Sequence, residues 1–271
     1  MTALRLALPA ALAAALAIPS SVVAAGTSIR SVQAQGKSRA SANLSGQKNP
    51  MLNTFHLKFT NGDHKVRKIA IEPGNDRIDA TLADRNSDDP IKLEARLIDS
   101  TNSYALRKVT RKCTGACTVP IVKNKSKGAQ LFLAGFSFRR VKGGDSNIKT
   151  LQLMPNSDST AYQVDFSDDG TFEYEVTIHY GFYGASRTGK RDETLTGYRL
   201  PGKRNSVIKM TKSRSASAST LRGFSFKFLN GDHHLKDIAV QQDSKRQYSV
   251  RFNDNNYDDP VMAQLDIVYL G

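Results

Sequence analysis

The sequence Phe-His-Leu-Lys-Phe-Thr-Asn-Gly-Asp-His at residues 55–64 returns at residues 224–233 as Phe-Ser-Phe-Lys-Phe-Leu-Asn-Gly-Asp-His. A weaker version lies between them, where Phe-Ser-Phe at 136–138 is followed by Gly-Gly-Asp at 143–145. Such self-similarity indicates one supersecondary unit that has been copied and packed against itself. We number the copies one, two and three in chain order.

Each copy continues with apolar residues at every second position. Copy one has Ile69 and Ile71, then Ile78, Ala80 and Leu82, then Ile91, Leu93, Ala95 and Leu97; copies two and three repeat the pattern at 151–180 and 238–269. This alternation is typical of strands with one apolar face, and such a face must be covered by another sheet. The sequence predicts an all-β fold of three four-stranded antiparallel meanders, packed as one or more β-sandwiches with basic hairpin connectors.

Turn residues agree with this prediction. Asn61-Gly62 and Asn230-Gly231 favour tight hairpin turns after the first strand, because both residue types tolerate positive φ. Pro90 and Pro260 stand where the fourth strand begins, a position at which a strand accepts proline.

Residues 1–25 have the pattern of a secretory signal peptide: Arg5 precedes an apolar run from Leu6 to Ile18, and Val23-Ala24-Ala25 offers small residues for cleavage. The alternative is a transmembrane anchor, but the run is shorter than the ~18–20 residues that span a bilayer. We therefore expect a secreted or periplasmic protein with no membrane span after signal removal.

Residues 26–54 are basic and contain few large apolar side chains, so we expect a flexible linker. The rest divides into copy one with a hairpin at 55–133, copy two with a basic connector at 134–221, and copy three at 222–271. Cys113 and Cys117 lie between strand-like segments, and we expect them to form a disulfide that pins the tip of that hairpin after export. In a reducing compartment the same pair suggests redox or metal chemistry instead.

Acidic loops precede the fourth strand of copies one and three. In a meander these loops lie at the same end as the first turn, and their carboxylate and amide oxygens are the ligands that Ca²⁺ prefers. The candidate metal ligands are Asp84, Asn86, Asp88, Asp89, Asp254, Asn256, Asp258 and Asp259. Candidate contacts for a polar ligand such as a sugar are Asp63, His64, Asp232 and His233. Plain turns, in which Asp and Asn bond their own backbone, are the remaining interpretation.

The formal net charge is +14, which favours contact with anions, and we expect the partner to be an acidic glycan, an envelope surface or another protein. Between Ser100 and Leu133 the chain has several Lys and Arg residues and no acid, and we select Arg107, Lys108 and Arg111 as candidate anion contacts. Nucleic acid is disfavoured, because the chain lacks tryptophan and its aromatic residues follow strand-core spacing.

No catalytic signature such as Gly-x-Ser-x-Gly or His-Glu-x-x-His is present. We therefore expect an exported, non-catalytic binding or adhesion protein that recognises carbohydrate or polyanion, with loops supported by Ca²⁺. The alternative is a structural or assembly subunit of the cell envelope. A glycan-active hydrolase that uses paired carboxylates ranks below both.

Overall fold

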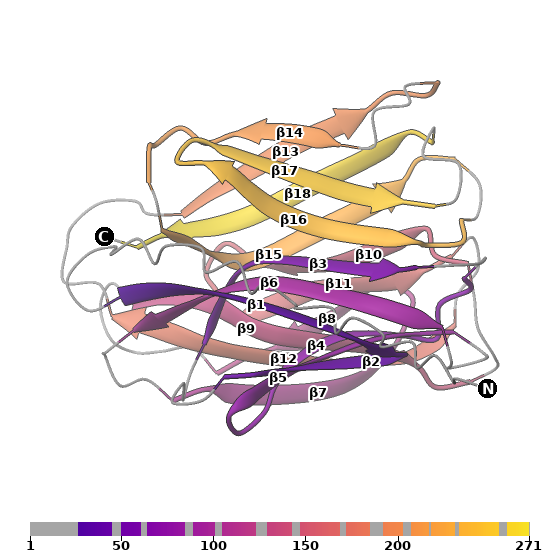
Figure 1. The fold of residues 1–271 in the computed structure, drawn as a ribbon, viewed down its shortest axis with the longest axis horizontal. Helices are drawn as coiled ribbons and strands as arrows, with labels where there is room; N and C mark the ends of the chain where they lie inside the picture. Colours follow the sequence, from indigo (N-terminus) through magenta and orange to yellow (C-terminus); the bar gives the residue numbers. More distant parts are fainter. Residues whose placement is uncertain are drawn as a thin grey trace, which may run out of the picture.

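The computed structural model describes residues 27–44, 50–60, 64–84, 89–100, 105–122, 129–142, 147–168, 172–184, 192–202, 207–216, 218–230, 233–254 and 259–270. These residues form 18 strands and no helix, which confirms the predicted all-β class (Figure 1). The expected signal peptide, residues 1–25, lies outside the described residues. No helix able to cross a membrane occurs in the part of the chain that the structure describes.

The strands form three antiparallel sheets of six strands each. The first sheet has the order β1 (Thr27–Lys37), β6 (Pro90–Ser100), β3 (Met51–Phe59), β16 (Asp237–Ser244), β17 (Gln247–Asn253) and β14 (Ile208–Thr211). The second has β2 (Arg39–Asn43), β5 (Arg77–Ala83), β4 (Lys68–Pro73), β9 (Ala129–Arg140), β12 (Glu173–Gly184) and β7 (Arg107–Thr114). The third has β13 (Asp192–Arg199), β18 (Val261–Tyr269), β15 (Ser219–Phe228), β10 (Thr150–Pro155), β11 (Ala161–Ser167) and β8 (Cys117–Pro120).

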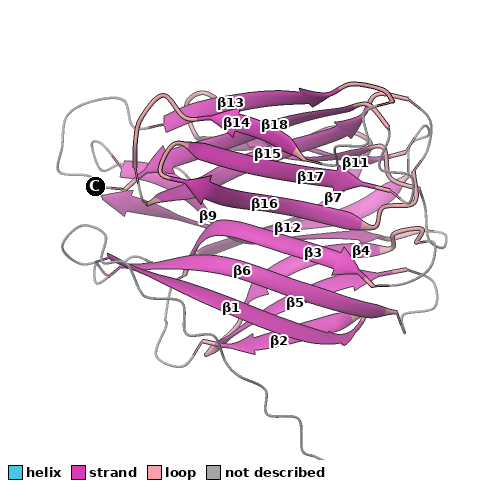
Figure 2. Ribbon diagram, turned by 45° about the horizontal axis from the view of Figure 1, so that its top comes forward, coloured by secondary structure: helices cyan, strands magenta, loops and turns pink. Residues whose placement is uncertain are grey.

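The three sheets share one strand order. At the centre of each, the first strand of one copy pairs with the second strand of another copy: β3 with β16, β9 with β4, and β15 with β10. The exchange closes in a ring, since copy one pairs with copy three, copy two with copy one, and copy three with copy two. Figure 2 shows β6, β3, β16 and β17 side by side in the first sheet, although they come from opposite ends of the chain.

The consecutive pairing of a meander is therefore wrong. In copy one, β4 and β5 form the expected hairpin, but β3 pairs with β6 rather than with β4. The segments after Asn61-Gly62 and Asn230-Gly231 accordingly lead into a different sheet instead of turning back along the same one. Alternation fixes which side chains face the core, but it does not fix which strand supplies the backbone partner. The predicted divisions at 55–133, 134–221 and 222–271 mark sequence similarity, because every sheet mixes strands from different copies.

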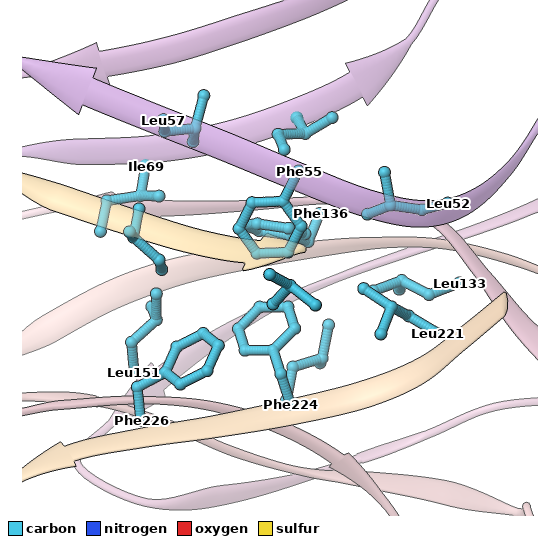
Figure 3. Packing of buried hydrophobic residues seen from close by; sticks show 14 of the residues in the cluster. Leu52, Phe55, Leu57, Ile69, Leu133, Phe136, Leu151, Leu221, Phe224 and Phe226 are labelled. Carbon is cyan, nitrogen blue, oxygen red and sulfur yellow. The ribbon is translucent and has the colours of Figure 1, made fainter. Parts of the chain in front are cut away.

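The central strands β3, β9 and β15 contact one another pairwise where the three sheets meet. Phe55, Phe136 and Phe224, the first phenylalanine of each copy, form a closed triangle with ring centroids 5.5, 5.7 and 4.9 Å apart. Their planes are inclined by 61–63°, the edge-to-face geometry that aromatic rings favour. Figure 3 shows the three rings converging, surrounded by buried leucine and isoleucine side chains.

Two residues before each of these phenylalanines, the ladder between the first and fourth strands contains a bulge. The register shifts at Leu52/Thr54 in β3 and at Leu221/Gly223 in β15, and the shift on β12 passes over Ala134 of β9. A bulge adds one residue to a strand and re-aims its side chain. In β3 that residue is the buried Asn53, which donates to the Ser219 carbonyl and so connects the first and third sheets.

The flexible linker expected at residues 26–54 is also wrong. This segment contains β1, which pairs with β6, and β2, which pairs with β5. Small apolar residues such as Val32, Ala40 and Ala42 are buried there, and the paired backbone compensates for the scarcity of large side chains. An edge strand needs fewer large side chains than a central one, so the small side chains of this segment are compatible with strands β1 and β2.

The basic connectors, like the segment with β1 and β2, supply edge strands to two different sheets. β7 and β8 join the edges of two different sheets, and so do β13 and β14, so neither pair is the self-paired hairpin expected from the sequence. Cys113 and Cys117 form a disulfide across the turn where the chain passes from the second sheet to the third. The predicted bond is present, but it stabilises a crossover between sheets rather than a hairpin tip.

Candidate functional site

The acidic loop of copy one meets a histidine from the loop after β3. His64 Nδ1 lies 3.2 Å from Asp84 Oδ2 and 3.4 Å from Asp89 Oδ2. Its ring stacks on Phe59 with centroids 3.8 Å apart, and both His64 and Asp84 are buried. One imidazole nitrogen therefore faces two carboxylates inside the protein. We call this group the first corner.

Copy three builds the same group, which we call the third corner. His233 Nδ1 lies 2.7 Å from Asp254 Oδ2 and 3.3 Å from Asp259 Oδ2. The His233 ring packs on Phe228 with centroids 4.0 Å apart. Two segments separated by about two thirds of the chain thus hold one histidine and two aspartates in matching positions.

Burial and neighbouring groups shift the pKa values of Asp89, Asp259 and His233. Burial, followed by the adjacent Asp254 carboxyl, raises the pKa of Asp259. Burial, followed by the adjacent Asp84 carboxyl, likewise raises the pKa of Asp89. Burial opposes ionisation of His233, but its hydrogen bond to Asp254 and its contact with the Asn230 carbonyl outweigh burial and raise its pKa. In each corner, two aspartate carboxyl groups share the positive charge that one histidine can carry.

Copy two has a different corner. Asp168 keeps the position of Asp84, but Phe172 stands where Asp89 stands and Arg140 where Phe59 stands, as the strand registers show. The Arg140 guanidinium lies over the Phe172 ring, 4.3 Å from its centroid. A permanent cation on an aromatic face replaces the imidazole and the second carboxylate, so this corner lacks the donor set of the other two.

The sequence anticipated part of this arrangement. The structure brings His64 together with Asp84 and Asp89, and His233 with Asp254 and Asp259, because antiparallel pairing of β3 with β6 and of β4 with β5 places both loops at one end. Asp63, Asn86, Asp88, Asp232, Asn256 and Asp258 lie outside the described residues. Phe59 and Phe228, on which the histidine rings pack, were not predicted, although each precedes its histidine by five residues in the sequence.

A second candidate site is the outer edge of the second sheet, formed by β7. Three cationic side chains are exposed there: Lys108, Arg111 and Lys112. No described residue forms an ion pair with any of the three. Arg107 is half-buried: it donates a 2.8 Å hydrogen bond to the Val122 carbonyl and lies over Phe182. Of the predicted anion contacts, Lys108 and Arg111 are therefore available to a partner, whereas Arg107 braces the edge. Lys112 joins them.

Other cations on the same sheet are neutralised by neighbouring acids. Arg39 pairs with Asp79 at 2.7 Å, Arg139 with Glu175 at 2.9 Å, and Lys142 with Glu173 at 2.8 Å. Lys112 faces Glu175 across the ladder, but that carboxylate is already engaged by Arg139. Uncompensated positive charge thus gathers along β7.

The outer face of the first sheet carries a polar groove of about 340 Å³, with Gln33, Thr54, Glu94 and Gln241 among its lining residues. His56 lies in its floor, where its Nε2 is 2.7 Å from Asp237 Oδ1 and its Nδ1 is 3.8 Å from Glu94 Oε2. These contacts hold the imidazole in a fixed orientation. His64 and His233, in contrast, are buried in their corners and are not placed to touch a sugar on the surface.

Comparison with protein-family models gives no match, and a search of curated proteins finds no similar sequence.

Proposed function

We propose that this chain is an exported, non-catalytic binding protein that holds polyanions, such as acidic glycans, along the β7 edge. The observation that carries the proposal is the set of three exposed cations without an ion-pair partner among the described residues, Lys108, Arg111 and Lys112. Clustered charge of one sign raises the local concentration of oppositely charged ligands. The net charge of +14 adds a long-range attraction of the same sign.

The geometry of a strand suits a linear anion. Lys108 and Lys112 lie on the same face of β7, four residues apart, so their backbones are separated by roughly 13 Å at a strand rise of ~3.3 Å per residue. Arg111 extends toward the other face of the edge. A chain of sulfate or carboxylate groups laid along β7 would meet cations on both sides, without needing a deep pocket.

Export is part of the proposal. The disulfide between Cys113 and Cys117 supports it, because such bonds persist in oxidising compartments. The same bond fixes the end of β7 where the chain crosses to β8, and so it orders the edge that carries the cations. A rigid edge loses less conformational entropy when it binds than a mobile tail does.

Heparin chromatography tests the proposal. The triple variant Lys108→Gln, Arg111→Gln, Lys112→Gln should elute at clearly lower salt than the native protein. The matched control Arg39→Gln, Lys68→Gln, Arg77→Gln removes the same charge from β2, β4 and β5 in the other half of the same sheet, where these cations are paired. It should shift elution much less. Equal shifts in the two variants would mean that only net charge matters, and the β7 proposal would be withdrawn.

A second candidate ligand is a neutral saccharide in the groove of the first sheet. The oriented His56 and the amide side chains of Gln33 and Gln241 offer donors and acceptors to hydroxyl groups. A glycan array separates the two ligands: binding of neutral glycans that survives high salt and is lost in Gln241→Ala supports the groove. Binding restricted to sulfated or carboxylated glycans supports β7.

A further inference from the structure

The first and third corners each bring together one histidine nitrogen and two carboxylate oxygens. These three atoms can all donate electron pairs, and they have fewer than three protons to share. In the third corner a proton on His233 Nδ1 points to Asp254 Oδ2 at 2.7 Å, and Asp259 Oδ2, only 3.3 Å from the same nitrogen, is buried and accepts no hydrogen bond. Burying an acceptor without a partner costs about 1–3 kcal/mol. A cation placed among the three atoms would satisfy all of them.

The other ring nitrogen indicates how the histidine is oriented. His233 Nε2 contacts the backbone carbonyl of Asn230, and because a carbonyl only accepts, Nε2 carries a proton. A cation that enters the corner displaces the Nδ1 proton, and the ring, still protonated on Nε2, then offers the lone pair of Nδ1 to that cation. Metal-binding histidines are usually held in this way, with one nitrogen on the ion and the other donating to a carbonyl or carboxylate.

The spacing of the donor atoms fits a small tetrahedral ion. Bonds of ~2.0–2.2 Å to Zn²⁺ place neighbouring ligands about 3.3 Å apart. The Nδ1-to-oxygen distances are 3.2 and 3.4 Å in the first corner and 2.7 and 3.3 Å in the third. In each corner one donor atom from every residue lies within 4.8 Å of the other two. Small adjustments would admit the ion.

We propose that each of these two corners binds one divalent transition-metal ion of the Zn²⁺ class, through His64, Asp84 and Asp89 and through His233, Asp254 and Asp259. A ligand set of one imidazole and two carboxylates suits such ions. Ca²⁺, which we expected from the acidic loops, takes six to eight oxygens and makes poor use of a buried imidazole. Water completes the fourth position.

The bound ion would join two separate loops. The histidine comes from the segment after the first strand of its copy, and the two aspartates flank the loop before the fourth strand. An ion that binds only the folded arrangement stabilises it by mass action. The corner of copy two needs no ion, since Arg140 supplies a fixed cation there. This inference does not rest on polyanion binding by β7.

Calorimetric titration tests it. The mature chain, residues 26–271 without a histidine tag, is stripped with a chelator and titrated with ZnCl₂. We expect two equivalents for the native protein, one for His64→Gln or for His233→Gln, and none for the double variant. His179→Gln is the matched control, because His179 also faces a carboxylate, Glu72, at 3.9 Å but lies outside the corners. It should keep two equivalents.

Circular dichroism verifies that each variant is folded. If the double variant is unfolded, Co²⁺ replaces Zn²⁺ as the probe on the native chain, and the strong visible absorption of tetrahedral Co²⁺ should saturate at two equivalents and disappear when Zn²⁺ is added. The proposal is overturned by a native chain without saturable Zn²⁺ or Co²⁺ binding, or by full binding in a folded double variant. Stoichiometric Ca²⁺ binding that excludes Zn²⁺ would overturn the assigned ion class.

Discussion

The three copies supply the same side chain at the centre of the molecule but different side chains at the loop-end corners. At the centre, all three copies place a phenylalanine in one triangle, and each ring contacts the other two. At the corners, copies one and three use a histidine with two aspartates, whereas copy two uses Arg140 over Phe172. A change at the centre disturbs three sheets at once. The side chains that form a corner all come from one copy, so they can differ from copy to copy without a matching change in the other two.

The largest expected effect lies at the centre. Phe136→Ala should lower the free energy of unfolding by about 3–5 kcal/mol, because it removes a fully buried ring and leaves a cavity. Phe55→Ala and Phe224→Ala should cost about as much if the three positions are equivalent. Denaturant unfolding measures the three values. Leu229→Ala, at a side chain that is 48% exposed, is the control and should change stability by less than about 0.5 kcal/mol.

At the corners, equivalent substitutions should have unequal effects. Asp84→Ala and Asp254→Ala, measured in the presence of a chelator, should each cost about 2–3 kcal/mol, because they remove a buried carboxylate that accepts from a buried histidine. Asp168→Ala, the same position in copy two, should cost less than about 1 kcal/mol, since that corner has no histidine against it. Equal costs in all three copies would show that the aspartate acts through the turn backbone and not through the imidazole.

A smaller effect is expected at the corner of copy two. Arg140→Ala removes the cation over Phe172 and a 2.9 Å hydrogen bond to the Lys142 carbonyl. We expect a loss of about 1–2 kcal/mol in thermal or denaturant unfolding. Arg140→Met keeps most of the apolar stem and should recover part of the loss. If Arg140→Met is as stable as the native chain, packing rather than charge holds this corner.

The smallest effect concerns the outer face of the second sheet, between centre and corner. His179 foremost, and then Lys68 at 3.1 Å, hold the pKa of Glu72 at about 2 against partial burial, below its usual 4.5. Since the folded-state pKa is the lower one, this contribution is complete above pH ~4.5 and is lost as the pH falls toward 2. The contact with His179 is long and solvent screens the pair, so we expect only about 1 kcal/mol.

Unfolding midpoints measured across this pH range test the prediction. In Glu72→Gln, the loss of stability between neutral and acid pH should be about 1 kcal/mol smaller than in the native protein. At neutral pH, Glu72→Gln and the double variant Glu72→Gln, His179→Gln should have nearly the same unfolding midpoint. An acid-side slope that is identical in native protein and Glu72→Gln would assign the loss to other carboxylates, such as those of the two corners.

Local patterns predicted most of the strands. The alternation at Ile69, Ile71 and their counterparts marks β4, β10 and β16, and Pro90 begins β6 as expected. The pairing partners were not predicted. A hairpin such as β4–β5 is chosen by chain proximity, whereas the pairing of β3 with β16 joins residues about 180 positions apart and depends on where the sheets meet. The linker prediction failed for the same reason, because β1 and β2 gain their stability from partners remote in sequence.

The sequence by itself determined that this chain is built from β strands with one apolar face, that copies one and three share an acidic loop and a histidine, and that positive charge gathers between the copies. These features depend on residue type and short spacing. Only the tertiary structure decided that the copies exchange strands around a phenylalanine triangle, that His64 and His233 are buried against two carboxylates each, and that the cations of β7 lack acidic partners among the described residues. Those outcomes depend on burial and on distances between remote segments, which no short window of sequence contains.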